Sequence, residues 1–195
     1  MYSFLFIYGG VFTSYLSLLL KSKIPRFKRT IEVDADKSLS IRSFIIGSLS
    51  QGVSSVFNVL ESEDVKFTIS ACKKLGVKII KVKPGNYKIY GKGLGSFAIK
   101  KNAELNFSNS GTASRLLLGA LSTTPDIHVK IKGDHSLNRR SMKKLINLLS
   151  RFGATFLPKG KERFPLKMIS SKMPIGINYK AGISAQLKSA AILAG

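Results

Sequence analysis

The sequence predicts an α/β fold built from a repeated unit of two helices and two or three strands. From Lys28 onward, short runs typical of β-strands alternate with stretches in which apolar residues recur at helical spacing. Gly47, Gly119 and Gly195 lie in or at the end of similar apolar runs, at nearly equal intervals along the chain. A helix, glycine, strand pattern also occurs twice at a similar interval. Self-similarity on this scale is typical of stacked units that share a core.

The first helix of each unit begins at a polar segment. Ser38, Ser110 and Ser184 follow one another at nearly the same interval, and we expect each to stand at a helix start. A cation follows each serine about one turn later, namely Arg42, Arg115 and Lys188. The sequence therefore predicts three helix starts of the same kind.

The second helix of a unit is predicted to end at a glycine in a left-handed conformation, at Gly76 and again at Gly153. A strand should follow each glycine, with a turn around Pro84 and Gly85. The predicted strands are residues 77–82, 87–90, 127–131 and 164–169. The third copy reaches only its first helix, so we expect the chain to end inside a unit.

A helix start offers unpaired backbone N–H groups and a partial positive charge, which suit phosphate or carboxylate binding beside a cation. Three such starts brought together would bind a substrate with several negative groups. The alternative for each serine is simple N-capping without a ligand. Both interpretations remain open from the residues alone.

Two further segments carry basic or glycine-rich patterns. Arg139 and Arg140 precede a predicted helix, and paired arginines suit bidentate recognition of carboxylate or phosphate, although a solvated loop would look the same. The stretch from Gly91 to Gly95 superficially suggests a phosphate-binding loop. No helix is predicted after it and no Gly-Lys-Ser/Thr ending is present, so we interpret it as a hairpin or loop.

Composition restricts the class of ligand without identifying it. Thirty-two Lys and Arg against ten Asp and Glu give a formal net charge of +22, which attracts nucleic acid, acidic membranes or anionic metabolites. The single cysteine, Cys72, excludes an internal disulfide and is predicted to pack inside a helix. With only His128 and His135 besides, we expect no metal site and no cofactor.

The amino terminus differs from the rest. Residues 1–20 carry no charge and are followed by several cations, which is compatible with a membrane anchor or with an extension from a wrongly placed start. Both interpretations stay open, and we treat residues 1–27 as an extension to the predicted domain of residues 28–195.

Four segments, in order, resemble the 5-enolpyruvylshikimate-3-phosphate synthase family, the 3-phosphoshikimate 1-carboxyvinyltransferases. They are Asp36-Lys37-Ser38-Leu39-Ser40-x-Arg42, Asn109-Ser110-Gly111-Thr112-Ala113-x-Arg115-Leu116, Gly133-Asp134-x-Ser136-Leu137-x-x-Arg140-x-Met142 and Ser184-Ala185-Gln186-x-Lys188-Ser189-Ala190. The resemblance covers essentially all of the chain after the amino-terminal extension.

The resemblance implies an enzyme of two domains, each built from three βαβαββ units. Such an enzyme transfers the enolpyruvyl group of phosphoenolpyruvate to the 5-hydroxyl of shikimate 3-phosphate, a step of chorismate and aromatic amino acid biosynthesis. It also implies a cytoplasmic enzyme that is a monomer when full length and that needs neither nucleic acid nor membrane. On this basis we expect residues 28–195 to be an incomplete first domain, inactive alone because the family's acid and base residues lie in the second half.

The resemblance also implies roles for individual residues. Lys37 would contact both substrates and act in catalysis by positioning and electrostatics. The groups implied for shikimate 3-phosphate are Lys37, Ser38, Arg42, Ser184, Ala185 and Gln186. Those implied for phosphoenolpyruvate are Lys37, Asn109, Gly111, Arg140 and Gln186, with Arg115 as a further, supporting candidate.

The sequence departs from the family at three positions near these segments. Asp34-Ala35 replaces a usual Pro-Gly, Ile41 replaces a frequent His, and Ser108 stands where Gly is common. No departure removes a ligand-contacting side chain. Ala35 and Ser108 could alter the loops, since glycine adopts backbone angles that they resist.

Two rivals remain. One is the sister enolpyruvyl transferase acting on UDP-N-acetylglucosamine, whose lysine is typically followed by Asn where this chain has Ser38, and which commonly carries a cysteine in a mobile loop. The other is a basic nucleic-acid-binding module, which the charge alone suggests.

Overall fold

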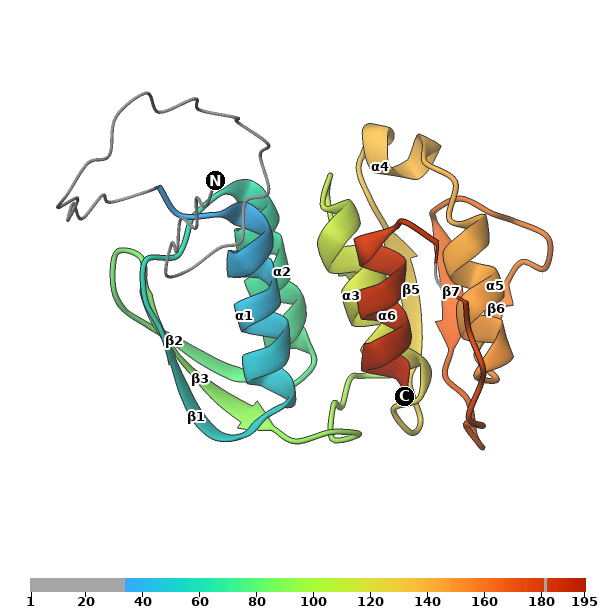
Figure 1. Ribbon diagram of the computed structural model, residues 1–195, viewed down its shortest axis with the longest axis horizontal. Coiled ribbons are helices and arrows are strands. Elements are labelled where there is room, and N and C mark those ends of the chain that lie inside the picture. The colour runs from blue at the N-terminus through green and yellow to red at the C-terminus, as the bar shows by residue number, and fades with distance from the viewer. Residues whose placement is uncertain (1–33, 181) are drawn as a thin grey trace, which may run out of the picture. The chain divides into compact units, whose positions relative to one another are not determined.

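The computed structural model describes residues 34–180 and 182–195, and the interpretation of residues 1–27 lies outside them. The elements follow one another as α1 (Lys37–Leu49), β1 (Gln51–Val56), α2 (Glu63–Lys74), β2 (Lys78–Lys83), β3 (Asn86–Lys92), β4 (Ala103–Asn106), α3 (Gly111–Ser122), β5 (His128–Lys132), α4 (His135–Arg139), α5 (Lys143–Arg151), β6 (Thr155–Leu157), β7 (Leu166–Ile169) and α6 (Ala185–Ala194). The predicted mixed α/β class is confirmed (Figure 1).

The strands form two sheets. The first has the order β1-β3-β2 and is antiparallel throughout, whereas the second has the order β4-β5-β7-β6. In the second sheet β4 runs parallel to β5, and the remaining pairs are antiparallel. The two sheets thus share one arrangement. In the first sheet β3 lies between β1 and β2, and in the second β7 lies between β5 and β6.

The helices pack on the sheets through apolar faces. Helix α1 packs against α2 and β3, where the Phe44 and Tyr87 rings meet edge to face with centroids 5.1 Å apart. Gly47 of α1 lies close to the Ile89 side chain of β3, so a Cβ added there would stand 3.0 Å from its Cδ1 atom. Helix α3 packs chiefly against α6, and α5 also contacts α6 (Figure 1). Gly47 and Gly119, which match in sequence, thus meet different partners.

Several local predictions are confirmed. Gly76 and Gly153 adopt positive φ values of 87° and 97° directly after α2 and α5, and a strand follows each of them. Pro84 and Gly85 form the turn between β2 and β3. The predicted strands end within a few residues of the observed ones, and no helix follows Gly91 to Gly95.

Cys72 is fully buried in α2, as predicted. Burial raises the pKa of its thiol to about 11, an effect that a hydrogen bond with Ser48 partly offsets. A thiol that stays protonated in an apolar setting is a packing group rather than a nucleophile.

One prediction about a helix start is wrong in position. Ser38 does not begin α1, because Asp36 is the N-cap and its Oδ1 atom accepts a hydrogen bond of 2.7 Å from the Leu39 backbone N–H. Arg139 and Arg140 precede α5 as predicted, but they also end a short helix, α4, which the sequence pattern did not reveal. Helix α4 is only five residues long and lacks an apolar periodicity, so local packing rather than pattern defines it.

Glu61 fixes the loop before α2. Its carboxylate accepts hydrogen bonds from Lys81 Nζ (2.7 Å), the Gly85 backbone N–H (2.8 Å) and the Tyr87 hydroxyl (2.9 Å). The Lys81 bond, followed by those from Gly85 and Tyr87, lowers the pKa of Glu61 from 4.5 to about 2. Because the folded pKa is depressed, the stabilisation is present above pH 4.5 and is lost as the pH falls through about 2.

We therefore expect Glu61→Gln to lower the melting temperature at pH 7, with a gap from the parent chain that narrows between pH 4.5 and pH 2. Circular dichroism melts at several pH values measure this gap. Glu104→Gln is the control, because Glu104 forms an ion pair of 2.7 Å with Lys132 in which the two side chains are 45% and 43% exposed, and it should change little. A gap as wide at pH 2 as at pH 7 would contradict the assignment.

Within the described residues, no helix combines the length and the apolar character needed to cross a membrane.

Candidate functional site

Three helix starts carry side-chain caps at equal spacing. Asp36 caps α1, Ser110 caps α3 through its Oγ atom (3.3 Å to the Ala113 N–H), and Ser184 caps α6 in the same way (3.4 Å to the Leu187 N–H). The two intervals between these caps are equal, a more regular spacing than that of the three serines in the sequence. A cap uses only one of the unpaired N–H groups of a helix start, so the others can bind an anion.

The helices α1, α3 and α6 run side by side with their N-termini toward the same end (Figure 1). The contact between α3 and α6 is close at Gly119, where a Cβ would stand 2.5 Å from the Ala190 carbonyl oxygen and 2.8 Å from its Cα. Only a residue without a side chain allows this approach. The start of α6 thereby lies beside the start of α3.

Side chains connect these two helix starts. Arg115 Nη1 donates a hydrogen bond of 2.7 Å to Gln186 Oε1 and one of 3.1 Å to the Gly111 carbonyl oxygen. Gln186 Nε2 in turn donates to Thr112 Oγ1 at 2.9 Å. The amide of Gln186 is thus held at both ends by α3, and Arg115 is a central residue of this cluster rather than a peripheral one.

A second guanidinium reaches the same place from α4. Arg140 Nη2 donates a hydrogen bond of 2.7 Å to Asn109 Oδ1, directly before the cap of α3. A Cβ at Gly111 would stand 2.7 Å from Arg115 Nη1 and 3.1 Å from Arg140 Nη1. Both guanidinium groups therefore lie close to the face of Gly111 where a side chain would begin.

This arrangement is electropositive. Partial burial lowers the pKa of Arg115, and the nearby charge of Arg140 lowers it further. No carboxylate of the described residues forms an ion pair with either arginine. Two like charges at a helix start favour a bound anion, which relieves their repulsion and meets the helix dipole.

The residues of α1 form a separate group. Lys37 Nζ lies 2.9 Å from Asp64 Oδ2 on α2, and Arg42 Nη1 donates to the Ser38 carbonyl oxygen at 3.3 Å. Among residues 34–180 and 182–195, no hydrogen bond or ion pair joins this group to the Arg115 cluster. The α1 group and the Arg115 cluster lie in the same layer of helices, because α1 contacts α3.

The predicted site residues differ in exposure. Lys37, Asn109, Arg140 and Ala185 are exposed, and Gly111 is buried at the start of α3. The half-buried members are Ser38, Arg42, Arg115, Ser184 and Gln186. Every predicted charged or amide side chain thus has at least part of its surface open to a ligand.

The sequence patterns assigned no ligand-site role to Thr112 or to Asp64. Thr112 lies inside the family motif of residues 109–116, which marked it as a candidate. Its contact with Gln186, however, joins residues 74 positions apart. Asp64 lies far from Lys37 along the chain, in the first turn of another helix. No spacing rule links residues on different helices, so only the packing of α1 on α2 reveals this pair.

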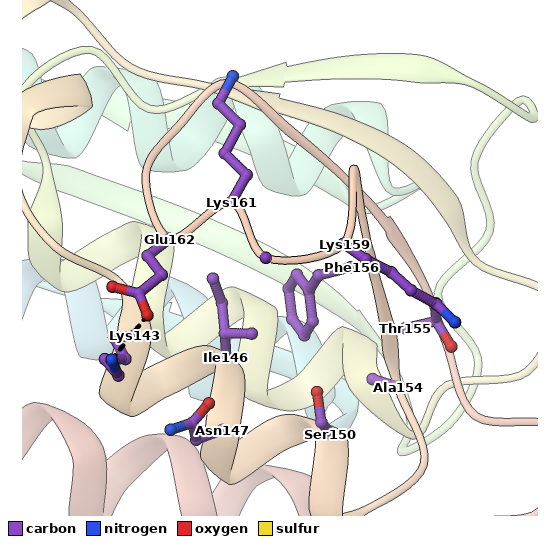
Figure 2. Close-up of a pocket in the computed structure, with 11 residues that line it drawn as sticks. Lys143, Ile146, Asn147, Ser150, Ala154, Thr155, Phe156, Lys159, Lys161 and Glu162 are labelled. Atoms are coloured by element: carbon purple, nitrogen blue, oxygen red, sulfur yellow. Dashed lines mark ion pairs between the residues drawn. The ribbon is translucent and has the colours of Figure 1, made fainter.

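A pocket of about 300 Å³ lies elsewhere, between α5 and residues 154–162. Figure 2 shows Ile146 and Phe156 at this pocket, and an ion pair of 2.9 Å between Lys143 and Glu162 lies at its side. None of the predicted site residues lines it. The candidate site is therefore the open surface at the helix starts and not this pocket.

Ser108, next to Asn109, carries the backbone strain that its replacement of glycine suggests. Its φ is +46°, whereas Ala35 does not adopt a positive φ. Its N–H donates to Asn106 Oδ1 (3.0 Å) and its carbonyl oxygen accepts from the Asp134 N–H (2.8 Å), so the loop cannot relax freely. A left-handed conformation costs a residue with a side chain roughly 1–2 kcal/mol.

We expect Ser108→Gly to raise the free energy of unfolding by up to about 1 kcal/mol, because relief of strain exceeds the added entropy of the unfolded chain. Urea unfolding measures the change. Ser108→Ala keeps the strain and is the matched control. If the alanine variant proves as stable as the glycine variant, strain at this position is not the cause.

Comparison with known proteins identifies the family of the chain. The sequence profile of EPSP synthase (3-phosphoshikimate 1-carboxyvinyltransferase) matches residues 21–195. The 3-phosphoshikimate 1-carboxyvinyltransferase of Leptospira interrogans serogroup Icterohaemorrhagiae serovar copenhageni (strain Fiocruz L1-130) is 42% identical over 178 residues, which are 90% of this chain and 40% of that protein. The enzyme of Jannaschia sp. (strain CCS1) is 38% identical over 167 residues, 85% of this chain and 37% of that protein.

A solved structure of EPSP synthase from Acinetobacter baumannii matches the fold with a TM-score of 0.77 at 35% identity, over 85% of this chain and 37% of that one. The chain spans about 40% of the length of the curated relatives that it matches. Since the family profile extends over nearly the whole sequence, the chain belongs to the EPSP synthase family.

Proposed function

We propose that this chain forms one half of a site that transfers the enolpyruvyl group of phosphoenolpyruvate to the 5-hydroxyl of shikimate 3-phosphate. In this reaction the hydroxyl oxygen bonds to C2 of phosphoenolpyruvate, the bond from C2 to the phosphate oxygen breaks, and inorganic phosphate leaves. Both substrates are small polyanions. The observation that carries the proposal is the pair of guanidinium groups, Arg115 and Arg140, beside Gly111 at the start of α3.

The phosphoenolpyruvate half of the site is proposed around α3. Arg140, held by Asn109, would form a bidentate contact with the phosphate or carboxylate, and the free N–H groups after Gly111 would add their dipoles. Gln186, held by Arg115 and Thr112, would lie between the two substrates. The side chains are already ordered by these bonds, which lowers the entropic cost of aligning the reactants.

The shikimate 3-phosphate half is proposed at α1 and α6. Ser184 and the N–H groups of Ala185 and its neighbours would bind the phosphate at the start of α6, and Ser38 and Arg42 would contribute from α1. Lys37, the first residue of α1, would reach both substrates. Charge neutralisation here lowers the electrostatic cost of bringing two anions together.

Enolpyruvyl transfer also needs groups that protonate the methylene carbon and deprotonate the hydroxyl. The carboxylates near the helix starts already have structural partners, because Asp36 caps α1, Glu61 holds the Gly85 turn and Asp64 pairs with Lys37. We therefore propose that this chain binds substrates but does not turn them over, and that the proton-transfer groups belong to the part of the family enzyme that it does not span.

We also propose that residues 28–195 are an incomplete first domain of the family fold, built from βαβαββ units. The equal intervals between the three caps and the matching order of β1-β3-β2 and β5-β7-β6 support this proposal. The second unit contains the elements β4, α3, β5, α5, β6 and β7, with α4 inserted. Helix α6 would belong to a third unit.

Isothermal titration of the purified chain with shikimate 3-phosphate, phosphoenolpyruvate and UDP-N-acetylglucosamine tests the proposal. We expect binding of shikimate 3-phosphate, tighter binding of phosphoenolpyruvate in its presence, and no binding of the nucleotide sugar. A phosphate-release assay on the chain alone should stay at background. Failure to bind shikimate 3-phosphate, together with a salt-sensitive gel shift of DNA or RNA, would instead support the nucleic-acid alternative.

A further inference from the structure

The cation at the start of α1 is held by a carboxylate from another helix. Lys37 Nζ lies 2.9 Å from Asp64 Oδ2, with 52% of the lysine side chain and 19% of the aspartate side chain exposed. A lysine side chain on a surface ordinarily samples many rotamers around its four-carbon stem. Here Asp64 holds the ammonium end of the Lys37 side chain beside the candidate site.

Asp64 is itself held in place. It lies in the first turn of α2, where the helix dipole favours a negative charge, and its carbonyl oxygen accepts a hydrogen bond of 2.8 Å from Thr68 Oγ1. The next residue, Val65, is completely buried in the core. The carboxylate is therefore a rigid anchor, because the start of α2 cannot move without disturbing the core contact between α1 and α2.

The geometry leaves Lys37 able to act. An ammonium group has three N–H donors, and one of them points to Asp64. Two donors remain for a ligand at the helix starts. We propose that Asp64 is a positioning residue, which holds the Lys37 ammonium in the direction of the anionic substrate and removes most of its rotamer freedom before binding. This inference rests on the role of Lys37 in the proposed function.

Two other roles for Asp64 make different predictions. If Asp64 only stabilises the dipole of α2, its replacement should affect stability but not Lys37. If it competes with the substrate for Lys37, its replacement should strengthen binding. Glu63 provides the control, since it lies in the same first turn of α2 and is exposed, so Glu63→Gln removes one negative charge from the same region.

The first measurement needs no substrate. The chain is acetylated briefly with a limiting reagent, and peptide mass spectrometry gives the labelling of Lys37 relative to exposed Lys66 on α2. We expect Asp64→Asn to raise this ratio about 2- to 5-fold, because an ion pair of this exposure contributes a factor of that order. Glu63→Gln should leave the ratio unchanged, and Asp64→Glu, which keeps a carboxylate within reach, should restore most of the protection.

The second measurement is the affinity for shikimate 3-phosphate by isothermal titration. We expect Asp64→Asn to bind about 2- to 5-fold more weakly than Glu63→Gln, a comparison in which the general effect of removing a negative charge largely cancels. Equal labelling of Lys37 in Asp64→Asn and Glu63→Gln would overturn the proposal. Tighter binding of shikimate 3-phosphate by Asp64→Asn than by Glu63→Gln would overturn it as well. If the parent chain binds no shikimate 3-phosphate, the proposed function fails, while the labelling ratio still decides whether Asp64 holds Lys37.

Melting curves accompany both measurements. If Asp64→Asn does not fold, Asp64→Ser, which keeps a good residue for a helix start, takes its place with the same expected results.

Discussion

Replacement of Arg140 with alanine should weaken the binding of phosphoenolpyruvate by about 10- to 100-fold. A hydrogen bond to a charged group contributes roughly 1.5–3 kcal/mol, and a guanidinium can offer two such bonds to one phosphate or carboxylate. The Arg140 guanidinium is already oriented by its 2.7 Å bond to Asn109, so little entropy is lost when a ligand binds. Titration of the variant in the presence of shikimate 3-phosphate measures the loss.

Two variants serve as controls for this prediction. Arg139→Ala removes an equal charge from the exposed last residue of α4 and should change the affinity only slightly, through the long-range field. Arg140→Lys keeps the charge but loses the planar fork, so its affinity should fall between those of the parent and the alanine variant. Equal losses for Arg139→Ala and Arg140→Ala would show that only net charge matters.

Replacement of Gly119 with alanine should have the largest effect on stability, lowering the free energy of unfolding by about 1–3 kcal/mol. The new methyl group would lie 2.5 Å from the Ala190 carbonyl oxygen and 2.8 Å from its Cα, both backbone atoms that no side-chain rotation can move. Helix α6 must then shift away from α3. Because Gln186 lies on α6, its bonds with Arg115 and Thr112 should lengthen.

Urea unfolding and titration with shikimate 3-phosphate check both consequences of the Gly119 change. Gly176→Ala is the control, since an added Cβ there meets no atom within 4 Å and its φ is not positive. The control should keep both stability and affinity. A Gly119→Ala variant with unchanged stability would mean that α3 and α6 do not pack as closely as the structure shows.

The sequence identified both Arg140 and Gly119, but it did not show which residues surround them. Arg140 was identified through its motif before α5, yet the sequence did not reveal that it also ends α4. Gly119 was noticed as part of a repeat with Gly47, but the repeat says nothing about its contact with α6. In both cases the residue was found by its type and its spacing, whereas its neighbours came from packing.

Arg115 is another residue whose contacts the sequence did not reveal. Its sequence position, one turn into α3, allowed only a supporting role to be assigned to it. The structure places it between Gln186 and Gly111, close enough to Arg140 that the second charge lowers its pKa. Its bond with Gln186 joins residues 71 positions apart, and no local pattern encodes it.

By itself the sequence determined the features that depend on a few neighbouring residues. Examples are the left-handed glycines after α2 and α5, the turn at Pro84 and Gly85, the serine caps of α3 and α6 and the burial of Cys72. These follow from backbone sterics, capping and apolar periodicity, which act within one or two helical turns. Only the tertiary structure decided that Asp36 caps α1, that Asp64 holds Lys37 and that two arginines lie beside Gly111. Each of these depends on a choice among competing local groups or on contacts between separate helices, and packing of the whole core settles it.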